Sequence, residues 1–309
     1  MKTTIKTIAL LFVVLGMHAE LNAQGVKLPQ ASSGQTIVQD LGLGKITLSY
    51  SRPNVKGRKI FGNLEPYDKV WRTGANTATV IKFTDAVKIN GQDVPAGEYG
   101  LFTIPNKTEW TVILNKTPKQ WGAYDYKEAD DILRIKVKPM TIKDKVETFT
   151  MQFANVLPTS AQLDMMWENT AIAVNITTSI DEQVMASIDA AMKTDKKPYV
   201  GAAQYYLDNG KDLATALNWM NEAEKANPKV PYIKLWKAKI QLKMGDIAGA
   251  QATAQAGVDL ATANKDDEYV RLNTWVLEEA KRQTKSKSND GSTTRVRTVT
   301  TTTREVRRN

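Results

Sequence analysis

The sequence predicts a two-domain chain, β then α: an antiparallel β-sandwich or jelly-roll-like domain followed by helical hairpins. From Thr36 to Thr178, short apolar or alternating runs are separated by turn residues, which is typical of strands. No segment of helix length lies between these runs, so the crossovers that a parallel sheet needs are missing. Near residue 180 the apolar period changes from two to about 3.6, which predicts that helices begin there.

Alternation and turn signals place the strands of the first domain. Residues 45–50 alternate with period two, as a strand with one buried face does. Asn90-Gly91 is a strong hairpin signal, and Pro95-Ala96-Gly97 predicts a second turn. These signals indicate about nine or ten strands. Besides 45–50, the expected strands cover residues 78–83, 86–89, 98–104, 110–115, 131–137, 146–153, 161–167 and 171–178.

The second domain is predicted to consist of amphipathic helices that pair into hairpins. Apolar residues with helical spacing place the first helix near 180–192. Four further helices end at Gly, Asn or Pro signals, at residues 199–208, 213–226, 232–244 and 247–263, and a last helix is expected at 267–281. Ala216 and Ala250 are 34 residues apart, and Met244-Gly245-Asp246 forms a small-residue turn. This pattern resembles the tetratricopeptide repeat, which implies two degenerate tetratricopeptide-like repeats and a capping helix.

The chain is expected to comprise a signal peptide (1–23), a β domain (24–179), a helical domain (180–284) and a disordered basic Thr-rich tail (285–309). Lys2 and Lys6 precede an apolar run, residues 8–17, that ends near small residues including Ala23. This is the order of a secretory signal, and the run is about half as long as a membrane span. We therefore expect an exported protein, periplasmic or secreted after cleavage near Ala23, without a membrane span.

Composition excludes several kinds of chemistry. The chain has no Cys, so it forms no disulfide, and its one His, His18, lies in the expected signal peptide. Ser-His-Asp and Cys-His catalysis and ordinary zinc sites are therefore excluded. The net charge of +9 is concentrated near the C-terminus, where residues 281–309 hold nine Lys and Arg against Asp290 and Glu305. A nucleic-acid partner is not expected for the nearly balanced remainder, and no motif predicts a cofactor or metal.

Five segments of the β domain follow one another in a distinctive order. They are residues 51–58 (SRPNVKGR), 60–62 (IFG), 70–76 (VWRTGAN), 95–102 (PAGEYGLF) and 121–124 (WGAY). In order and spacing they resemble a bacterial exported family known as domain of unknown function 2911. The resemblance covers roughly residues 30–178. It implies membership in that family, but no established activity or site residues.

Basic and aromatic residues in these segments are candidates for a ligand site. An anion-binding or sugar-binding pocket in the strand-joining loops could be lined by Arg52, Lys56, Arg58, Trp71, Arg72 and Asn76, with Trp71 as an apolar wall. The alternative interpretation is structural: the nearby glycines meet backbone demands, while Arg72 and Asn76 hydrogen-bond irregular loop backbone. The structural interpretation is favoured, and the binding interpretation stays open.

A second candidate region, residues 121–131, combines aromatic rings with four carboxylates. Stacking on a carbohydrate would involve Trp121, Tyr124 and Tyr126, with simple loop packing as the alternative. A carboxylate-dependent hydrolase acting on glycans would need two acids across one cleft, drawn from Asp125, Glu128, Asp130 and Asp131. Because Lys127 interrupts the cluster and the EF-hand spacing is absent, a solvated acidic loop is favoured over a catalytic or metal site.

The leading functional hypothesis is a non-catalytic binding protein with no assigned catalytic residue. The β domain would recognise a carbohydrate or anionic ligand, and the helical repeats would contact a protein partner. The glycan hydrolase is the alternative from another class, and a purely structural envelope protein is a third possibility. Trp219, Trp236 and Trp275 lie on the predicted helices and are expected in the core.

Overall fold

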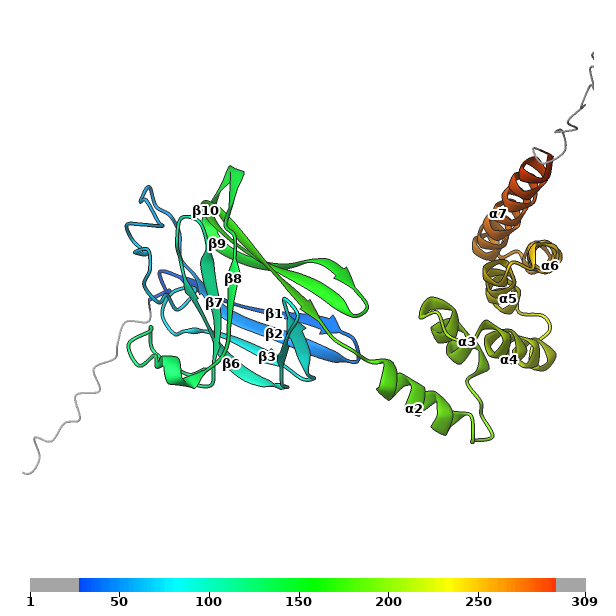
Figure 1. Cartoon of the computed structure of the whole chain (residues 1–309), viewed down its shortest axis with the longest axis horizontal. Coiled ribbons are helices and arrows are strands. Elements are labelled where there is room, and N and C mark those ends of the chain that lie inside the picture. Colours follow the sequence, from blue (N-terminus) through cyan, green and yellow to red (C-terminus); the bar gives the residue numbers. More distant parts are fainter. Residues whose placement is uncertain (1–27, 293–309) are drawn as a thin grey trace, which may run out of the picture. The chain divides into compact units, whose positions relative to one another are not determined.

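Two structural units follow one another along the chain, and the boundary lies after Ile180, within one residue of the expected position. The computed structural model describes residues 28–292, with side chains as far as Ser286 (Figure 1). The expected signal peptide at 1–23 and the tail residues 293–309 lie outside the described residues. Within residues 28–292, no helix is both long and apolar enough to cross a membrane.

The first unit contains two antiparallel sheets, as the sequence predicts. The six-stranded sheet has the order β1-β2-β3-β6-β7-β8, and the four-stranded sheet has the order β5-β4-β10-β9. The strands are β1 (Ser33–Leu41), β2 (Gly44–Arg52), β3 (Thr79–Phe83), β4 (Val87–Ile89), β5 (Gln92–Val94), β6 (Gly97–Ile104), β7 (Trp110–Asn115), β8 (Asp131–Val137), β9 (Met140–Leu157) and β10 (Ser160–Thr177). Asn90 and Gly91 join β4 to β5 with positive φ at both residues, as the expected hairpin turn requires.

The long hairpin of β9 and β10 differs from the expected separate strands. Both strands are 18 residues long, and their pairing continues through register shifts near Ser160, Glu168 and Thr170. The polar residues around Glu168 predict a break in the sequence, but they form bulges instead. Glu168 has a φ of 54°, and its carboxylate accepts the N–H of Ile60. The bulge therefore places an acceptor for the loop that follows β2.

The inner faces of the two sheets share one hydrophobic core. All ten strands contribute to it, and so do Phe61 and Trp71 from the loops between β2 and β3. Trp71 stacks on Trp167 of β10 with ring centroids 5.7 Å apart, while Phe61 meets Trp110 of β7 edge to face at 4.7 Å. Phe, Tyr and Trp side chains each bury a large apolar area, so these rings dominate the packing between the two sheets. The first unit is thus a β-sandwich with an aromatic centre.

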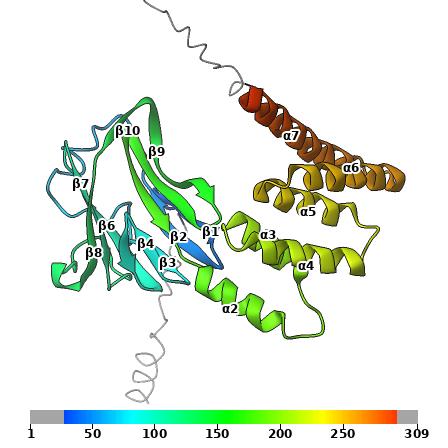
Figure 2. The same ribbon diagram turned by 45° about the vertical axis from the view of Figure 1, so that its right-hand side comes forward.

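The second unit is built from helices at almost the expected positions. They are α2 (Asp181–Ala191), α3 (Tyr199–Asp208), α4 (Leu213–Ala226), α5 (Pro231–Met244), α6 (Ile247–Asn264) and α7 (Asp267–Ser292). The pairs α3/α4 and α5/α6 form hairpins, and α7 packs against α5 and α6 (Figure 2). The α7 helix continues to Ser292, beyond the expected domain end at residue 284.

The two helical hairpins repeat the same local design after 34 residues. Asp212 caps α4 by accepting the N–H groups of Ala214 and Thr215, and Asp246 caps α6 by accepting that of Gly249. Ala216 and Ala250 are both completely buried, which lets the paired helices approach closely. At the 34-residue spacing, the structure thus has an aspartate cap and a buried alanine in each of the two hairpins.

Candidate functional site

The basic residues after β2 are mostly used to hold the loop in place. Arg52 donates from Nε to the carbonyl of Phe149 (3.1 Å) and from Nη2 to Oγ1 of Thr150 (2.9 Å). Arg58 donates to two carbonyls of its own loop, those of Val55 and Asn54. These bonds tie β2 to β9 and close the loop, so both arginines have a structural task in the fold.

Trp71 does not form the wall of the predicted pocket, whereas Lys56 lies at the surface. Trp71 is buried in the aromatic core, where its indole N–H is donated to the carbonyl of Gly74 (3.0 Å). Its place as an apolar wall of a ligand pocket is therefore wrong, because pairing with Thr103 of β6 turns the ring between the sheets. Lys56 is exposed, with a φ of 49°, and its backbone N–H is donated to Glu147.

Arg72 differs from the structural interpretation of its motif. It makes no hydrogen bond to loop carbonyls, and its Nε is buried without a hydrogen-bond partner among the described residues. The partly buried Glu65 lies near it without forming an ion pair. Burial raises the pKa of Glu65 to about 7, although the positive charges of Arg72 and then Arg58 lower it. Glu65 was not among the predicted residues, since no sequence pattern distinguishes it from a solvated acid.

The aromatic residues of the 121–131 loop separate into exposed and buried ones. The Trp121 side chain is 65 % exposed and that of Tyr124 is 84 % exposed. Tyr126 packs on Phe102 with ring centroids 5.2 Å apart, and its hydroxyl is donated to Asp131 (2.6 Å). Burial and the bond to Asp131 raise the pKa of Tyr126. Trp121 and Tyr124 can therefore stack on a ligand, whereas Tyr126 is part of the fold.

The four candidate carboxylates do not form an acid pair across a cleft that we can identify. Asp131 is almost fully buried and accepts hydrogen bonds from Asn115, Tyr126 and Arg134. Glu128 forms an exposed ion pair with the same arginine (3.5 Å). None of the cavities described below is lined by any of the four. In residues 28–286, no group of three or more Asp and Glu residues has a geometry that could hold a metal ion.

The two predicted loops do meet, at Asn76 and Trp121. Gly122 donates its N–H to the carbonyl of Asn76 (3.1 Å), and Thr77 forms an antiparallel bridge with Trp121. The amide of Asn76 in turn donates to Oγ of Ser51 (3.2 Å) and to the carbonyl of Ser32. Asn76 therefore connects the exposed Trp121 to the surface of β2, as the structural interpretation predicts for an amide in irregular backbone.

A shallow cavity of about 290 Å³ lies at this junction, and we call it the hydroxyl hollow. Its hydroxyl-bearing surface residues are Thr36, Ser49, Ser51 and Thr77; Gly34, Gln35, Ala78, Val80 and the buried Tyr50 complete the lining. Oγ1 of Thr36 and Oγ of Ser49 lie 2.9 Å apart and share a hydrogen bond. Trp121 does not line the hollow itself, but its backbone forms a bridge with Thr77, which does.

Sequence reasoning missed most of the hydroxyl hollow, although a signal for it was present. On β2 the hydroxyl residues Thr47, Ser49 and Ser51 alternate with buried Ile46, Leu48 and Tyr50. The alternation was used to place a strand, but its polar half also defines an outer face lined with hydroxyls. Its neighbour Thr77 comes from a separate loop, which no local pattern on β2 indicates.

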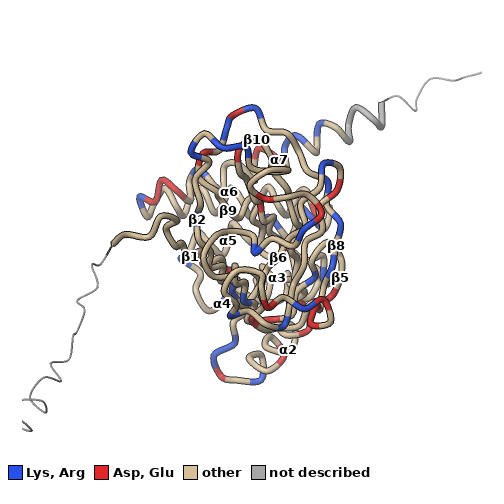
Figure 3. The backbone as a smooth tube through the Cα atoms, turned by 90° about the vertical axis from the view of Figure 1, so that its left-hand side faces the viewer, with Lys and Arg blue, Asp and Glu red and all other residues tan. Residues whose placement is uncertain are grey.

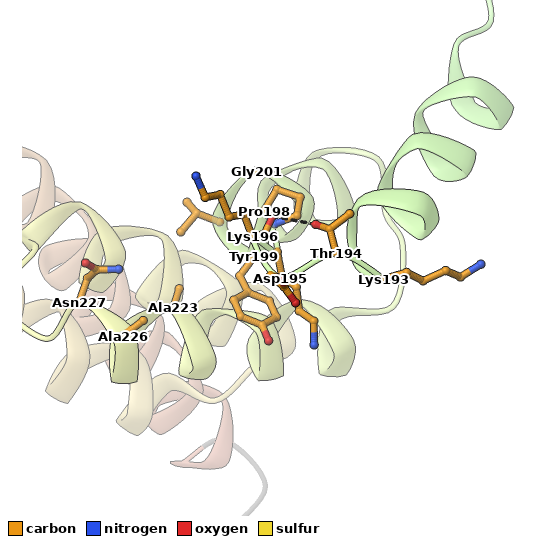
Figure 4. Close-up of a pocket in the computed structure, with 12 residues that line it drawn as sticks. Lys193, Thr194, Asp195, Lys196, Pro198, Tyr199, Gly201, Ala223, Ala226 and Asn227 are labelled. Atoms are coloured by element: carbon orange, nitrogen blue, oxygen red, sulfur yellow. Dashed lines mark hydrogen bonds between the residues drawn. The ribbon is translucent and has the colours of Figure 1, made fainter.

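The helical unit contains two cavities of its own. One, of about 660 Å³, is lined by residues of the α2–α3 connection, the start of α3 and the end of α4 (Figure 4). Its polar lining residues are all exposed, and the Lys193 side chain extends away from the other labelled residues in Figure 4. The other, of about 630 Å³, is lined by residues of α3, α5 and α7, including Trp275.

The three helical tryptophans do not share one environment. Trp219 packs on Tyr206 with ring centroids 4.7 Å apart, and Trp236 is also partly buried. Trp275 is 59 % exposed, so its expected core position is wrong. The face of α7 that packs on its neighbours is formed by Leu272, Val276, Leu277 and Ala280, and Trp275 lies beside that face.

Comparison with known proteins identifies the first unit by family but not by activity. Residues 32–176 match a family model described as "Protein of unknown function (DUF2911)". Neither the curated proteins nor the solved structures provide a match. The matched range begins one residue before β1 and ends one residue before β10 does, so it coincides with the β-sandwich. The match to this family model therefore falls on the β-sandwich, the region in which the order of the five motifs predicts a resemblance to the same family.

Proposed function

We propose that this chain is an exported, non-catalytic binding protein whose β-sandwich recognises a hydroxyl-rich ligand of the carbohydrate class. The observation that carries the proposal is an exposed tryptophan, Trp121, bridged to Thr77, which lines the hydroxyl hollow. A sugar ring has an apolar face that stacks on indole and a rim of hydroxyls that exchange hydrogen bonds with Ser and Thr. Both features occur here on one surface.

The fixed hydroxyl groups support this proposal. Because Ser51 accepts a hydrogen bond from Asn76, its own proton is free to be donated to a ligand. Thr36 and Ser49 already share one hydrogen bond, so a ligand would meet a pre-oriented pair. The open, shallow form of the hollow favours a neutral polymer surface over a small buried ligand.

The expected signal peptide supports the choice of ligand class. An exported protein meets envelope or extracellular glycans at high concentration, and the charge of the chain outside its termini is nearly balanced. Basic and acidic residues are interspersed along the backbone in Figure 3. A near-neutral body gives no general attraction to polyanions, so we favour a neutral polysaccharide over an anionic ligand.

Affinity gel electrophoresis tests the proposal. The mature chain is run through gels that contain a neutral soluble polysaccharide: β-glucan, xylan, mannan or dextran. We expect at least one of them to retard the protein, and Trp121→Ala to weaken that retardation about tenfold, equivalent to about 1.4 kcal/mol. The matched control is Trp275→Ala, which removes an equally exposed tryptophan from the other unit. Retardation by none of the four, or equal retardation of Trp121→Ala, would refute the proposal.

A further inference from the structure

The cavity between α3, α5 and α7 combines positive charge with exposed apolar side chains. We call it the lysine groove, and the residues that matter are Leu207, Lys239, Lys243, Met244, Trp275 and Gln283. The α5 helix contacts both α3 and α7 (Figure 2). Because all these residues belong to one unit, the groove is complete within that unit.

The lysines of α5 fall into two classes. Lys234 and Lys237 both form ion pairs with Glu224 of α4, which neutralises that side of the helix. Lys239 and Lys243 form no ion pair with any described residue, and Nζ of Lys239 lies 4.2 Å from the ring centroid of Trp236. Like charges four residues apart on a helix repel each other. The groove therefore keeps two adjacent positive charges that no ion pair within residues 28–286 neutralises.

The positive charge is local to the groove. Residues 181–286 contain fifteen Lys and Arg and fifteen Asp and Glu, so this stretch as a whole is neutral. A surface for nucleic acid or anionic membrane would carry an extended basic patch. The tail residues 293–309 hold five Arg and one Glu, so their charge does not suit the groove either. The occupant is thus a small acidic feature of another molecule.

The exposed apolar side chains beside the lysines further limit the chemical class of molecule that the groove can bind. Trp275 is 59 % exposed and Met244 is 42 % exposed, and both are types that serve as anchors in protein interfaces. A simple anion would use the lysines and leave these two side chains in water. A peptide that alternates acidic and apolar residues would use both.

We propose that the lysine groove binds an acidic peptide segment of a protein partner. Carboxylates of the segment pair with Lys239 and Lys243, and an apolar side chain between them packs on Trp275 and Met244. Gln283, held by Glu279, offers an amide for the peptide backbone. This inference is independent of the carbohydrate site, since it involves only the helical unit.

Fluorescence anisotropy of the full mature chain tests the inference. The probe is a labelled peptide in which Leu is flanked on each side by two glutamates, and its control carries glutamines instead. We expect the glutamine peptide to bind at least tenfold more weakly, and Lys239→Glu and Lys243→Glu to weaken the acidic probe to the same degree. Trp275→Ala should weaken it about fivefold without changing the charge. Lys193→Glu, a charge reversal at the other helical cavity, should leave binding unchanged.

Three outcomes would overturn the inference. The first is equal binding of the glutamate and glutamine peptides, and the second is an unchanged affinity in Lys239→Glu and Lys243→Glu. The third is binding of duplex DNA or anionic phospholipid vesicles with the same dependence on these lysines, because that result would assign the groove to polyanions. Circular dichroism of each variant checks that the helices are retained.

Discussion

The β-sandwich and the helical unit use their unusual residues in opposite ways. In the sandwich, the motif residues Trp71, Arg52 and Arg58 bury themselves or hydrogen-bond the backbone. In the helical unit, which has weaker motifs, Trp275, Lys239 and Lys243 are left exposed or without an ion pair in residues 28–286. Most of the unusual motif residues in the sandwich are therefore part of the fold, with Trp121 as the exposed exception, whereas the exposed residues of the regular helices are available for binding.

The largest expected effect concerns the stability of the sandwich after substitution of two of its tryptophans. Trp71→Ala removes the centre of the aromatic core and should lower the free energy of unfolding by about 3–5 kcal/mol. Trp121→Ala removes an exposed ring and should change it by less than about 0.5 kcal/mol. Urea unfolding of both variants provides the measurement. Similar losses in the two variants would mean that Trp121 is part of the fold and not of a ligand site.

The next effect concerns the carboxylates that could have formed a hydrolase site. Asp131→Ala leaves Tyr126, Asn115 and Arg134 without their shared acceptor. We expect the free energy of unfolding to fall by about 2–4 kcal/mol. This is less than for a fully buried ion pair, because the Arg134 side chain is one-third exposed. Asp125→Ala is the matched control and should have no effect on thermal unfolding. A stable Asp131→Ala variant would return this residue to the list of functional candidates.

The fold was largely predictable because its signals are local. Alternation placed β2, and the Asn90-Gly91 turn placed the β4–β5 hairpin. The helices were found within a few residues, apart from α7, whose polar final turns carry no apolar period. The bulge at Glu168 could not be predicted, because its carboxylate is fixed by Ile60, more than a hundred residues away.

The sites were less predictable for the same reason. Whether Trp71 lies in a core or in a pocket depends on its pairing with Thr103, which no local pattern specifies. The hydroxyl hollow needs the bridge between Thr77 and Trp121, a contact between separate loops. Local alternation shows that Ser49 faces outward, but not what stands beside it.

A third, smaller effect should appear as a pH dependence of the sandwich. The folded chain raises the pKa of Glu65 from about 4.5 to about 7. Between these values the folded state holds the proton that the unfolded chain has lost, so stability falls as pH rises from 4.5 to 7 and then levels off. Glu65→Gln should lack this decline and be more stable than the native chain by roughly 1–3 kcal/mol at pH 8.

Unfolding midpoints of the native chain and Glu65→Gln, measured from pH 4 to 9, test this sign. The two should agree near pH 4 and diverge above pH 5. Because the charge of Arg72 lowers the pKa of Glu65, Arg72→Leu should extend the decline to higher pH. A constant gap between native chain and Glu65→Gln across the range would mean that Glu65 is not perturbed by burial.

The smallest effect compares two helical glycines, and it tests whether the repeated hairpins are closely packed. Gly257 of α6 is buried where α7 passes, and a Cβ there would lie 2.5 Å from Cγ of Asn273 and 3.0 Å from Cβ of Lys234. Gly201 of α3 has open space around it. Alanine is favoured over glycine in a helix by up to about 1 kcal/mol, so Gly201→Ala should raise stability by that amount or less.

At Gly257 the same gain is opposed by overpacking, which costs about 1–3 kcal/mol in a filled interior. Asn273 is completely buried and donates to the carbonyl of Tyr269, so it has little room to move. We therefore expect Gly257→Ala to lower the free energy of unfolding by about 1 kcal/mol, with the opposite sign to Gly201→Ala. Thermal and urea unfolding of the two variants, followed at the transition of the helical unit, measure both changes in stability. If both alanines stabilise the protein, α6 and α7 are not closely packed at Gly257. The packing of α7 would then not fix the position of Trp275 in the lysine groove.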